Sequence, residues 1–506
     1  MLHPASFRLR AGFWLSLLCA GAGTLLIVLA PWGTVGAPIL ALLFFGGASL
    51  GLMLRDSPVE ERRFVIRLFL VALAVRLLAA LVFHLAYGSG SFWSSDAKSY
   101  DQAAWVMARN WKNPASTPEG LGSLEFIRSH LYPRLLAGLY FVIGHSTDAA
   151  IILNLVLGVS SVYLVYRLGV LLIGPAAARW AGWLAACYTG FWWWEMMALK
   201  DALFMFLILL FFLALHRCWN SLTRADRSGA DGLQAALWGA VMMLIFLAAG
   251  ELREYVPLLL LCSALWLPVA TFLRSGGAGR WAVALAAAAA FIAVLWPRIM
   301  ARELVPVAVE ADSLFFQSVE LPVTENVAVF LRWVGEHPAS FAQYMALAAF
   351  SSALAPYAWI LPGTLPEVPR FEPGMIAFPG MWMWYLLIPF TILGAVQAIR
   401  RSRGEAWPVF FFSMAGFLLF SFFIPRESRH RDIVMPFALM FAAEGIVYSR
   451  RWWLLGLLVW IPLVGFIAWK MQSAVPVLLA AGLAGGAILI RDIRMRRQNA
   501  LRIRER

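Results

Sequence analysis

Long apolar stretches alternate with short polar segments along most of this chain. A helix needs roughly 20 apolar residues to cross the hydrocarbon core of a bilayer, and many of the stretches have about that length. They lack the strict in–out alternation of a membrane β-barrel. The pattern therefore predicts an all-α polytopic membrane protein, a bundle of about fourteen (12–14) spans of this length. The expected spans are 12–30, 34–54, 64–86, 150–167, 176–194, 199–217, 232–250, 255–273, 281–299, 376–400, 407–424, 431–449, 452–470 and 474–491.

Three further segments have helical patterning without the character of a full span. Segments 98–111 and 131–144, inside the long polar loop 87–149, are too short to cross, and we expect interfacial helices there. Segment 341–361 is long enough, but its crossing would carry the arginines that follow span 376–400 to the outer side. Prolines also end this segment. The pattern favours a re-entrant or interfacial helix at 341–361.

Arginines indicate which polar segments face the cytoplasm. The loop Arg55–Arg63 holds three of them, and the positive-inside rule places it and the N-terminus inside. Basic residues then fall on the same side in the later loops, and both termini come out cytoplasmic. The long loop 87–149 and the acidic segment 300–340 come out on the opposite face. These basic residues are Arg167, Arg179, Arg217, Arg224, Arg227, Arg274, Arg280, Arg450, Arg451 and those of the tail 492–506.

Composition narrows the protein class further. Of the 506 residues, 62% are hydrophobic and 14% charged, which excludes an ordinary soluble domain. The net charge of +13 comes from arginines at helix ends and in the tail, which fits anchoring to anionic headgroups better than nucleic-acid binding. The cysteines all lie in or at the ends of apolar spans, so neither a disulfide framework nor a zinc site is expected. No clear cleavage signal follows the first apolar run, which indicates an uncleaved span.

Four charged clusters fall on the predicted outer face, and the first is centred on Asp96. On a helix beginning near Ser95, Asp96 and Tyr100 share one face, with Asp101 beside them. A carboxylate near a membrane-linked substrate can accept a proton from an attacking hydroxyl or amine. The alternative is that Asp96 only caps a surface helix.

The second cluster lies in the outer turn 192–201. Lys200 is one of only four lysines in the chain, and it stands beside Asp201 and five residues after Glu195. A lysine at the rim of a bundle can hold a phosphate, or pair with either of these acids. The alternative is a helix start at Asp201 with a snorkelling lysine.

The third and fourth clusters add arginines. Arg253 stands with Glu254 and Tyr255 between two spans, where charges are costly unless paired or solvated. It could bind a phosphate in a bidentate manner or form an internal pair with a glutamate. In the fourth cluster, basic residues gather where the charge rule predicts depletion, which favours an anionic ligand such as a lipid mono- or diphosphate. Its members are Arg426, Arg429, His430 and Arg431.

With these motifs in place, residues 64–450 resemble the polytopic GT-C glycosyltransferases, which use lipid-phosphate-linked sugars. The likeness is greatest to bacterial relatives of the protein O-mannosyltransferases and the lipid A aminoarabinose transferases. The motifs that carry it are Val75-Arg-Leu, Ser95-Asp-Ala-Lys-Ser-Tyr100, Leu131 to Tyr140, Leu199-Lys-Asp-Ala-Leu203, Leu252-Arg-Glu-Tyr255 and Arg431 to Pro436.

The resemblance implies a division of the chain. Two extra N-terminal helices precede a catalytic core that includes the outer loop. A periplasmic loop with an interfacial helix, a set of C-terminal helices and a basic cytoplasmic tail follow. The corresponding ranges are 1–63, 64–300, 301–375, 376–491 and 492–506.

The resemblance also implies a reaction: inverting transfer of a sugar from a polyprenyl-phosphate donor to a lipid, glycan or protein acceptor, at the outer face of a bacterial inner membrane. The acidic residue of the first outer loop acts as base or orients the acceptor, and by position it is Asp96. Family members often have two adjacent acids, whereas Ala97 follows here and Asp101 is the remaining candidate. Lys200, Arg253 and the arginines of 426–431 are expected to hold the phosphate. No metal ligand set or cofactor is predicted. The absence of a second acid next to Asp96 weakens any case for a divalent cation.

Two other classes fit the same pattern. A Wzy-type polysaccharide polymerase or ligase also uses outer arginines and a long outer loop, but it would not need Asp96. A transporter or flippase for lipid-linked sugars usually carries charges near the bilayer midplane. Arg76, near the middle of a predicted span, keeps that hypothesis open. A purely structural scaffold would not explain four charged clusters on one face.

Overall fold

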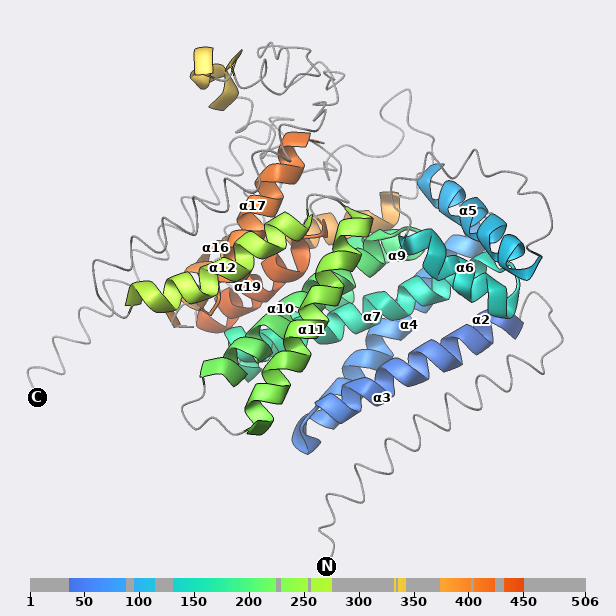
Figure 1. Cartoon of the computed structure of the whole chain (residues 1–506), viewed down its shortest axis with the longest axis horizontal. Helices are drawn as coiled ribbons and strands as arrows, with labels where there is room; N and C mark the ends of the chain where they lie inside the picture. The colour runs from blue at the N-terminus through green and yellow to red at the C-terminus, as the bar shows by residue number, and fades with distance from the viewer. Residues whose placement is uncertain are drawn as a thin grey trace, which may run out of the picture. The chain divides into compact units, whose positions relative to one another are not determined.

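The computed structural model of the chain is helical throughout the part it describes (Figure 1). Within that part, fourteen α-helices, a short π-helical turn and a 3-10 turn make up the regular structure. The described residues are 36–87, 95–113, 131–223, 229–253, 256–274, 332–333, 335–342, 374–401, 405–423 and 432–449.

Six of the described helices are long and apolar enough to cross a membrane, so the prediction of an all-α multi-pass membrane protein is confirmed at this level. The expected spans 12–30, 281–299, 452–470 and 474–491, and nearly all of segment 341–361, lie outside the described residues. The total of about fourteen spans therefore stays a prediction. The six candidate spans are Gly36–Asp56, Val59–Val82, Thr147–Leu172, Asp201–Thr223, Asp231–Leu252 and Met383–Arg401.

The chain forms two compact units. The first comprises Met1–Leu168, Gly182–Pro257 and Pro373–Ala377, and the second comprises Gly169–Ala181, Leu258–Glu372 and Phe378–Arg506. The residues of the first three charged clusters, as far as the structure describes them, all belong to the first unit. That unit is described first.

Long helices at different depths of burial build the first unit. Helix α7 (Thr147–Leu172) is the most enclosed, with 83% of its apolar window buried, whereas α11 (Gly229–Leu252) has 17%. A helix that is apolar all round and buried forms a core, and one with exposed leucines suits a lipid-facing position. Helices α2 (Gly36–Ala41) and α3 (Gly47–Asp56) make the first described span, joined by the π-turn Leu42–Gly46.

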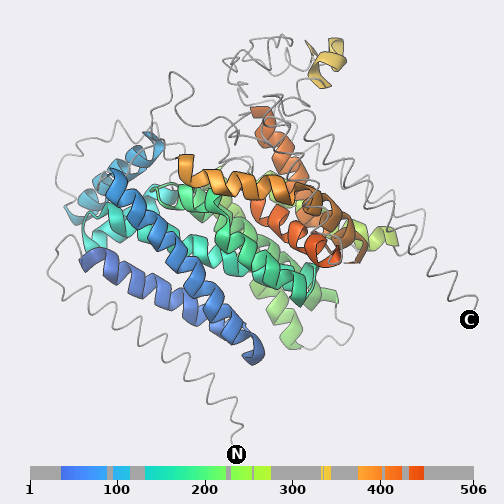
Figure 2. The same cartoon turned by 180° about the vertical axis from the view of Figure 1, so that it is seen from behind.

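Helices α4 and α10 complete the long elements of this unit. Helix α4 runs from Arg62 to Tyr87 and α10 from Asp201 to Thr223, close to the predicted spans 64–86 and 199–217. Helix α10 packs along α11, and the two views show them side by side (Figures 1 and 2). Their apolar faces supply the packing that holds the polar ends in place.

The two short helices expected in the outer loop are present. Helix α5 (Ser95–Lys112) and α6 (Leu131–Ile143) pack against each other (Figure 1), and neither has the length and apolarity of a span. Helix α6 is followed by Gly144, whose φ of 83° is the left-handed conformation that often terminates a helix. The prediction of two helices at 98–111 and 131–144 is confirmed, and their interfacial position stays a prediction.

The predicted span 176–194 is wrong as a single helix. The chain forms α8 (Pro175–Cys187) and α9 (Thr189–Glu195), separated by Tyr188 in an extended conformation. The break frees the carbonyl of Ala186, which accepts hydrogen bonds from Arg76 Nη1 (3.2 Å) and Trp192 Nε1 (3.0 Å). An apolar window cannot reveal this break, because the compensating donor Arg76 is distant in sequence.

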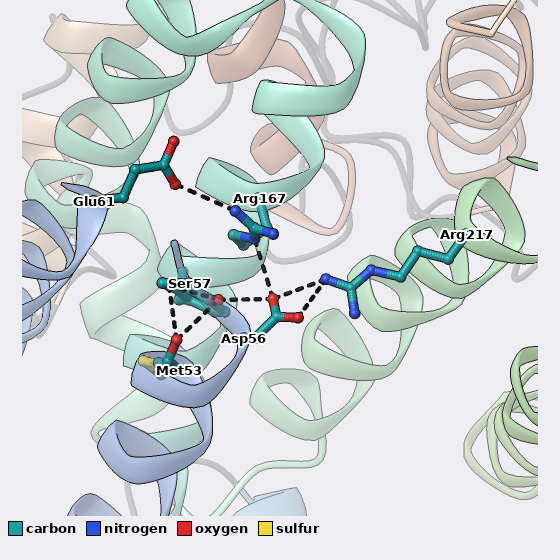
Figure 3. Close-up of polar contacts among 7 residues, drawn as sticks. Met53, Asp56, Ser57, Glu61, Arg167 and Arg217 are labelled. Atoms are coloured by element: carbon teal, nitrogen blue, oxygen red, sulfur yellow. Dashed lines mark hydrogen bonds and ion pairs between the residues drawn. The ribbon is translucent and has the colours of Figure 1, made fainter. Parts of the chain in front are cut away.

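One end of the first unit carries an ion-pair network (Figure 3). Asp56, at the end of α3, accepts hydrogen bonds from Arg167 Nε of α7 (3.1 Å) and Arg217 Nη2 of α10 (2.6 Å). Arg167 also pairs with Glu61 (3.3 Å) of the 3-10 turn Val59–Glu61. The structure thus brings together three segments that the charge pattern assigns to one side of the membrane.

The second unit holds most of α12 (Val256–Arg274) and α16 (Gly374–Arg401), together with α17 (Trp407–Phe423) and α19 (Met435–Tyr448). Helices α16 and α19 cross closely at two glycines. A Cβ on Gly394 would overlap the Phe441 carbonyl, and one on Gly445 would overlap the Phe390 carbonyl. Small residues at such crossings let helix backbones touch, which is how membrane helices often associate.

Candidate functional site

Lys200 is the meeting point of three of the four predicted clusters. Its Nζ donates a hydrogen bond to the carbonyl of Leu252 (3.1 Å) and lies 5.8 Å from the centre of the Tyr100 ring. Tyr100 comes from α5, Lys200 precedes α10, and Leu252 ends α11. Segments separated by up to about 150 residues therefore converge on one ammonium group, whose position over an aromatic face is favourable.

The position of Lys200 follows from the start of α10. Its carbonyl accepts the amide of Phe204 (2.9 Å), the first hydrogen bond of that helix, so its side chain leaves from the helix N-terminus. Backbone N–H groups at this end favour negative charge. A cation and a helix N-terminus therefore occur together, an arrangement that suits an anionic group.

Arg253 and Asp201 form an ion pair next to Lys200. Arg253 Nη2 lies 3.0 Å from Asp201 Oδ1, and their side chains are 12% and 9% exposed. The guanidinium also lies over the ring of Phe204, 5.4 Å from its centre. Asp201 is the first residue of α10, where a carboxylate is favoured by the helix dipole. Arg253, the residue after α11, is thus oriented by an acid at the start of α10.

A buried amide lies beneath these charges. The side chain of Asn154, from α7, donates to the carbonyls of Met197 (2.6 Å) and Leu199 (3.0 Å), and accepts the hydroxyl of Tyr132 (3.1 Å). Tyr132 packs edge-on against Tyr100 at 5.7 Å between ring centres. Burial raises the pKa of Tyr132 far above its ordinary value, so its phenol stays protonated and donates.

We call this group the Lys200 cluster. It joins α5, α6 and α7 with the start of α10 and the residue after α11 by direct side-chain contacts. Two cations stand against one carboxylate, which leaves the group positively charged. Its members are Tyr100, Tyr132, Asn154, Lys200, Asp201 and Arg253.

Asp96 lies in the first turn of α5, half-buried, four residues before Tyr100. Residues four apart share a face of an α-helix and are separated by about 6 Å along its axis. Asp96 is therefore one turn from the ring that contacts Lys200. The predicted placement of Asp96 and Tyr100 on one face of a helix is compatible with this geometry.

Asp101 belongs to a different contact. It accepts a hydrogen bond from Tyr140 Oη (2.6 Å) and lies 3.0 Å from His145 Nε2, whose ring stacks on Trp105 at 5.1 Å. Burial raises the pKa of Tyr140, and the Asp101 carboxylate raises it further, so Tyr140 remains a donor. These contacts join α5 to α6. The sequence pattern did not reveal His145, since its partner lies 44 residues away.

Glu195 pairs with Arg76 rather than joining the Lys200 cluster. Arg76 Nε lies 2.5 Å from Glu195 Oε2, and the two side chains are 0% and 1% exposed. Arg76 also donates to the carbonyl of Ala72 (3.2 Å) in its own helix. Gly158 of α7 provides the room, because a Cβ there would overlap the Glu195 carboxyl group. The charge of Arg76, near the middle of the predicted span 64–86, is therefore paired inside the protein.

The remaining predicted residues lie outside the described part of the chain, and their roles stay predictions. They are Glu254, Tyr255, Arg426, Arg429, His430 and Arg431. Within the described ranges, no three histidine, cysteine or acidic side chains are grouped so that they could hold a metal ion. Asn154 was also missed, although an asparagine inside an apolar span is itself a signal, since burying its amide is costly without partners.

Comparisons with protein-family models, with curated proteins and with solved structures give no match to this chain. The comparisons therefore add no relative whose activity could be carried over. In the part of the chain that it describes, the structure itself establishes a helical protein with six candidate membrane spans. A functional assignment has to rest on the residues and on the geometry of the Lys200 cluster.

Proposed function

We propose that this protein is a membrane glycosyltransferase that moves a sugar from a polyprenyl-phosphate donor to an envelope acceptor at the outer face of the membrane. One observation carries the proposal: three charged clusters that are far apart in sequence meet at the Lys200 cluster. A positively charged group at one end of a membrane bundle suits the phosphate of a lipid-linked donor. The GT-C-like motifs supply the reaction class.

Lys200 and Arg253 are assigned to the donor phosphate. A phosphodiester donor carries one negative charge, and the departing lipid phosphate gains another as the glycosidic bond breaks. Two cations in a largely buried setting stabilise that developing charge more strongly than water-exposed groups would. Asp201 orients Arg253, because its carboxylate accepts a hydrogen bond from one guanidinium nitrogen.

Asp96 is assigned to the acceptor. The acceptor oxygen attacks the anomeric carbon from the face opposite the phosphate, and its proton passes to the Asp96 carboxylate. The bond between the anomeric carbon and the phosphate oxygen breaks, its electron pair stays on the phosphate, and the configuration inverts. The place of Asp96, one turn from the Lys200-contacting Tyr100, supports this assignment.

The central test is transfer activity of Asp96→Asn, which keeps the size of the side chain but cannot accept the proton. Purified protein in lipid nanodiscs is incubated with radiolabelled polyprenyl-phosphate sugars and envelope acceptors. We expect the variant to lose about 100-fold or more of the wild-type transfer rate, the usual contribution of a general base. Asp148→Asn is the matched control, because Asp148 is also half-buried in the first turn of a helix, α7.

The same assay separates the rival functions. Full transfer by Asp96→Asn, at wild-type expression, would refute the base and favour a Wzy-type polymerase or ligase. Movement of labelled donor across proteoliposomes without a covalent product would favour a transporter. Arg76 gives that function no support, since its pairing with Glu195 is fully buried.

A further inference from the structure

The segment that carries Lys200 has no regular structure of its own. Residues Met196–Leu199 form a turn between α9 and α10, with one internal hydrogen bond from the amide of Leu199 to the carbonyl of Met197 (2.8 Å). All four residues are buried, at 0–2% exposure. Irregular backbone inside a membrane protein persists only where its polar groups find partners.

Asn154 supplies those partners. Its Nδ2 donates to two carbonyls of this turn, those of Met197 (2.6 Å) and Leu199 (3.0 Å), and its Oδ1 accepts the Tyr132 hydroxyl (3.1 Å). The residue is 0% exposed and lies on α7, the most buried of the six candidate spans. The second carbonyl belongs to Leu199, directly before Lys200, so the hydrogen bond from Asn154 fixes the position of the backbone at Lys200.

We propose that Asn154 is a positioning residue for donor binding: it holds the Met197–Leu199 turn so that the Lys200 ammonium faces the donor phosphate. The inference rests on the proposed function and identifies what organises its phosphate site. Tyr132 supports Asn154, because its hydroxyl donates to the Asn154 amide oxygen and so fixes the orientation of that amide. Asn154 itself does not touch the phosphate. Its effect on binding therefore passes through Lys200.

Asn154→Asp tests the proposal with almost no change in volume. The carboxylate cannot donate, and it places oxygen against two carbonyl oxygens. We expect the donor KM and the Kd for a short polyprenyl monophosphate to rise about tenfold or more, the effect of losing a well-placed charged partner. The kcat at saturating donor should fall as well, because the same ammonium is assigned to the charge that develops on the departing phosphate.

A double-mutant cycle separates positioning from general destabilisation. Lys200→Gln should raise the same KM and Kd, and adding Asn154→Asp to it should cause almost no further rise, because both act through one ammonium. Ser161→Ala is the control for altering a buried polar group of α7, since its hydroxyl donates only within its own helix, to Leu157 (2.9 Å). That variant should bind donor as the wild type does.

Several results would overturn the inference. If the fold-increases in donor KM from Asn154→Asp and Lys200→Gln multiply in the double variant, Asn154 does not act through Lys200. An unchanged donor KM in Asn154→Asp would refute the inference as well. If this variant is not monodisperse, Tyr132→Phe takes its place in the cycle, with an expected KM rise of about 2- to 5-fold that vanishes in the Lys200→Gln background. Wild-type protein that neither binds the lipid phosphate nor transfers sugar would instead refute the proposed function.

Discussion

Arg76 and Glu195 illustrate how this chain accommodates charge at single residues. Both side chains are essentially inaccessible, and they meet through the hydrogen bonds of Nε (2.5 Å) and Nη2 (3.4 Å). The free energy needed to remove two charges from water can exceed their Coulombic attraction. This buried pair is tolerated because its hydrogen-bond geometry is good. Its position explains Gly158, whose missing side chain leaves the space for the carboxyl group.

Glu195→Gln should therefore destabilise the protein strongly. The arginine would remain buried without a counter-charge, at a cost of about 3–5 kcal/mol. The double variant Arg76→Met/Glu195→Leu removes both charges and should recover most of that loss, because an apolar pair of similar volume needs no desolvation. Thermal unfolding in detergent measures both. If Glu195→Gln were as stable as the wild type, the buried Arg76–Glu195 ion pair would be refuted.

At this scale the sequence predicted part of the candidate site. Lys200, Asp201 and Arg253 stood out because charges between apolar spans are locally visible. Which charge pairs with which was not predictable, since Arg253 meets Asp201, an acid 52 residues away. His145 escaped for a similar reason, and its role depends on α5 and α6 packing together.

Among the elements, regular helices were predicted better than their interruptions. The windows for α4, α7 and α10 agree with the structure because apolar length alone defines a span. The break between α8 and α9 was missed, since the run 176–194 is largely apolar and the carbonyl freed by the break is satisfied in part by Arg76, which is distant in sequence. Tertiary contacts therefore decide where an apolar run stays a single helix.

The α16–α19 crossing offers a test at the level of elements. Gly394→Ala should separate the two helices, because the new methyl group would overlap the Phe441 carbonyl. We expect a loss of about 1–3 kcal/mol, the usual result of overpacking, measured by thermal unfolding of the purified protein. Gly239→Ala is the control: nothing lies within 4 Å of a Cβ in that α11 position, and alanine is the better helix former. Equal stability of the two variants would refute a close crossing.

Across the first unit as a whole, polar groups are separated to the two ends of α10. Asp201 begins that helix within the Lys200 cluster, and Arg217 joins the network around Asp56 near its other end. Sixteen residues of helix place the two about 24 Å apart, close to the thickness of the hydrocarbon core, ~30 Å. A helix spanning the bilayer would thus carry the proposed donor site at one face and the ion-pair network at the other.

This arrangement predicts which exposed positions react from outside the cell. In a chain whose four cysteines are replaced, Lys98→Cys on α5 should react with a membrane-impermeant maleimide in intact spheroplasts. Glu60→Cys, exposed in the 3-10 turn beside the Asp56 network, should react only after permeabilisation. The reverse pattern would place the Lys200 cluster in the cytoplasm and exclude transfer from an outward-facing donor. Outside labelling of both positions would contradict their separation across the bilayer, because the arginine network and the donor site could not then lie at opposite faces.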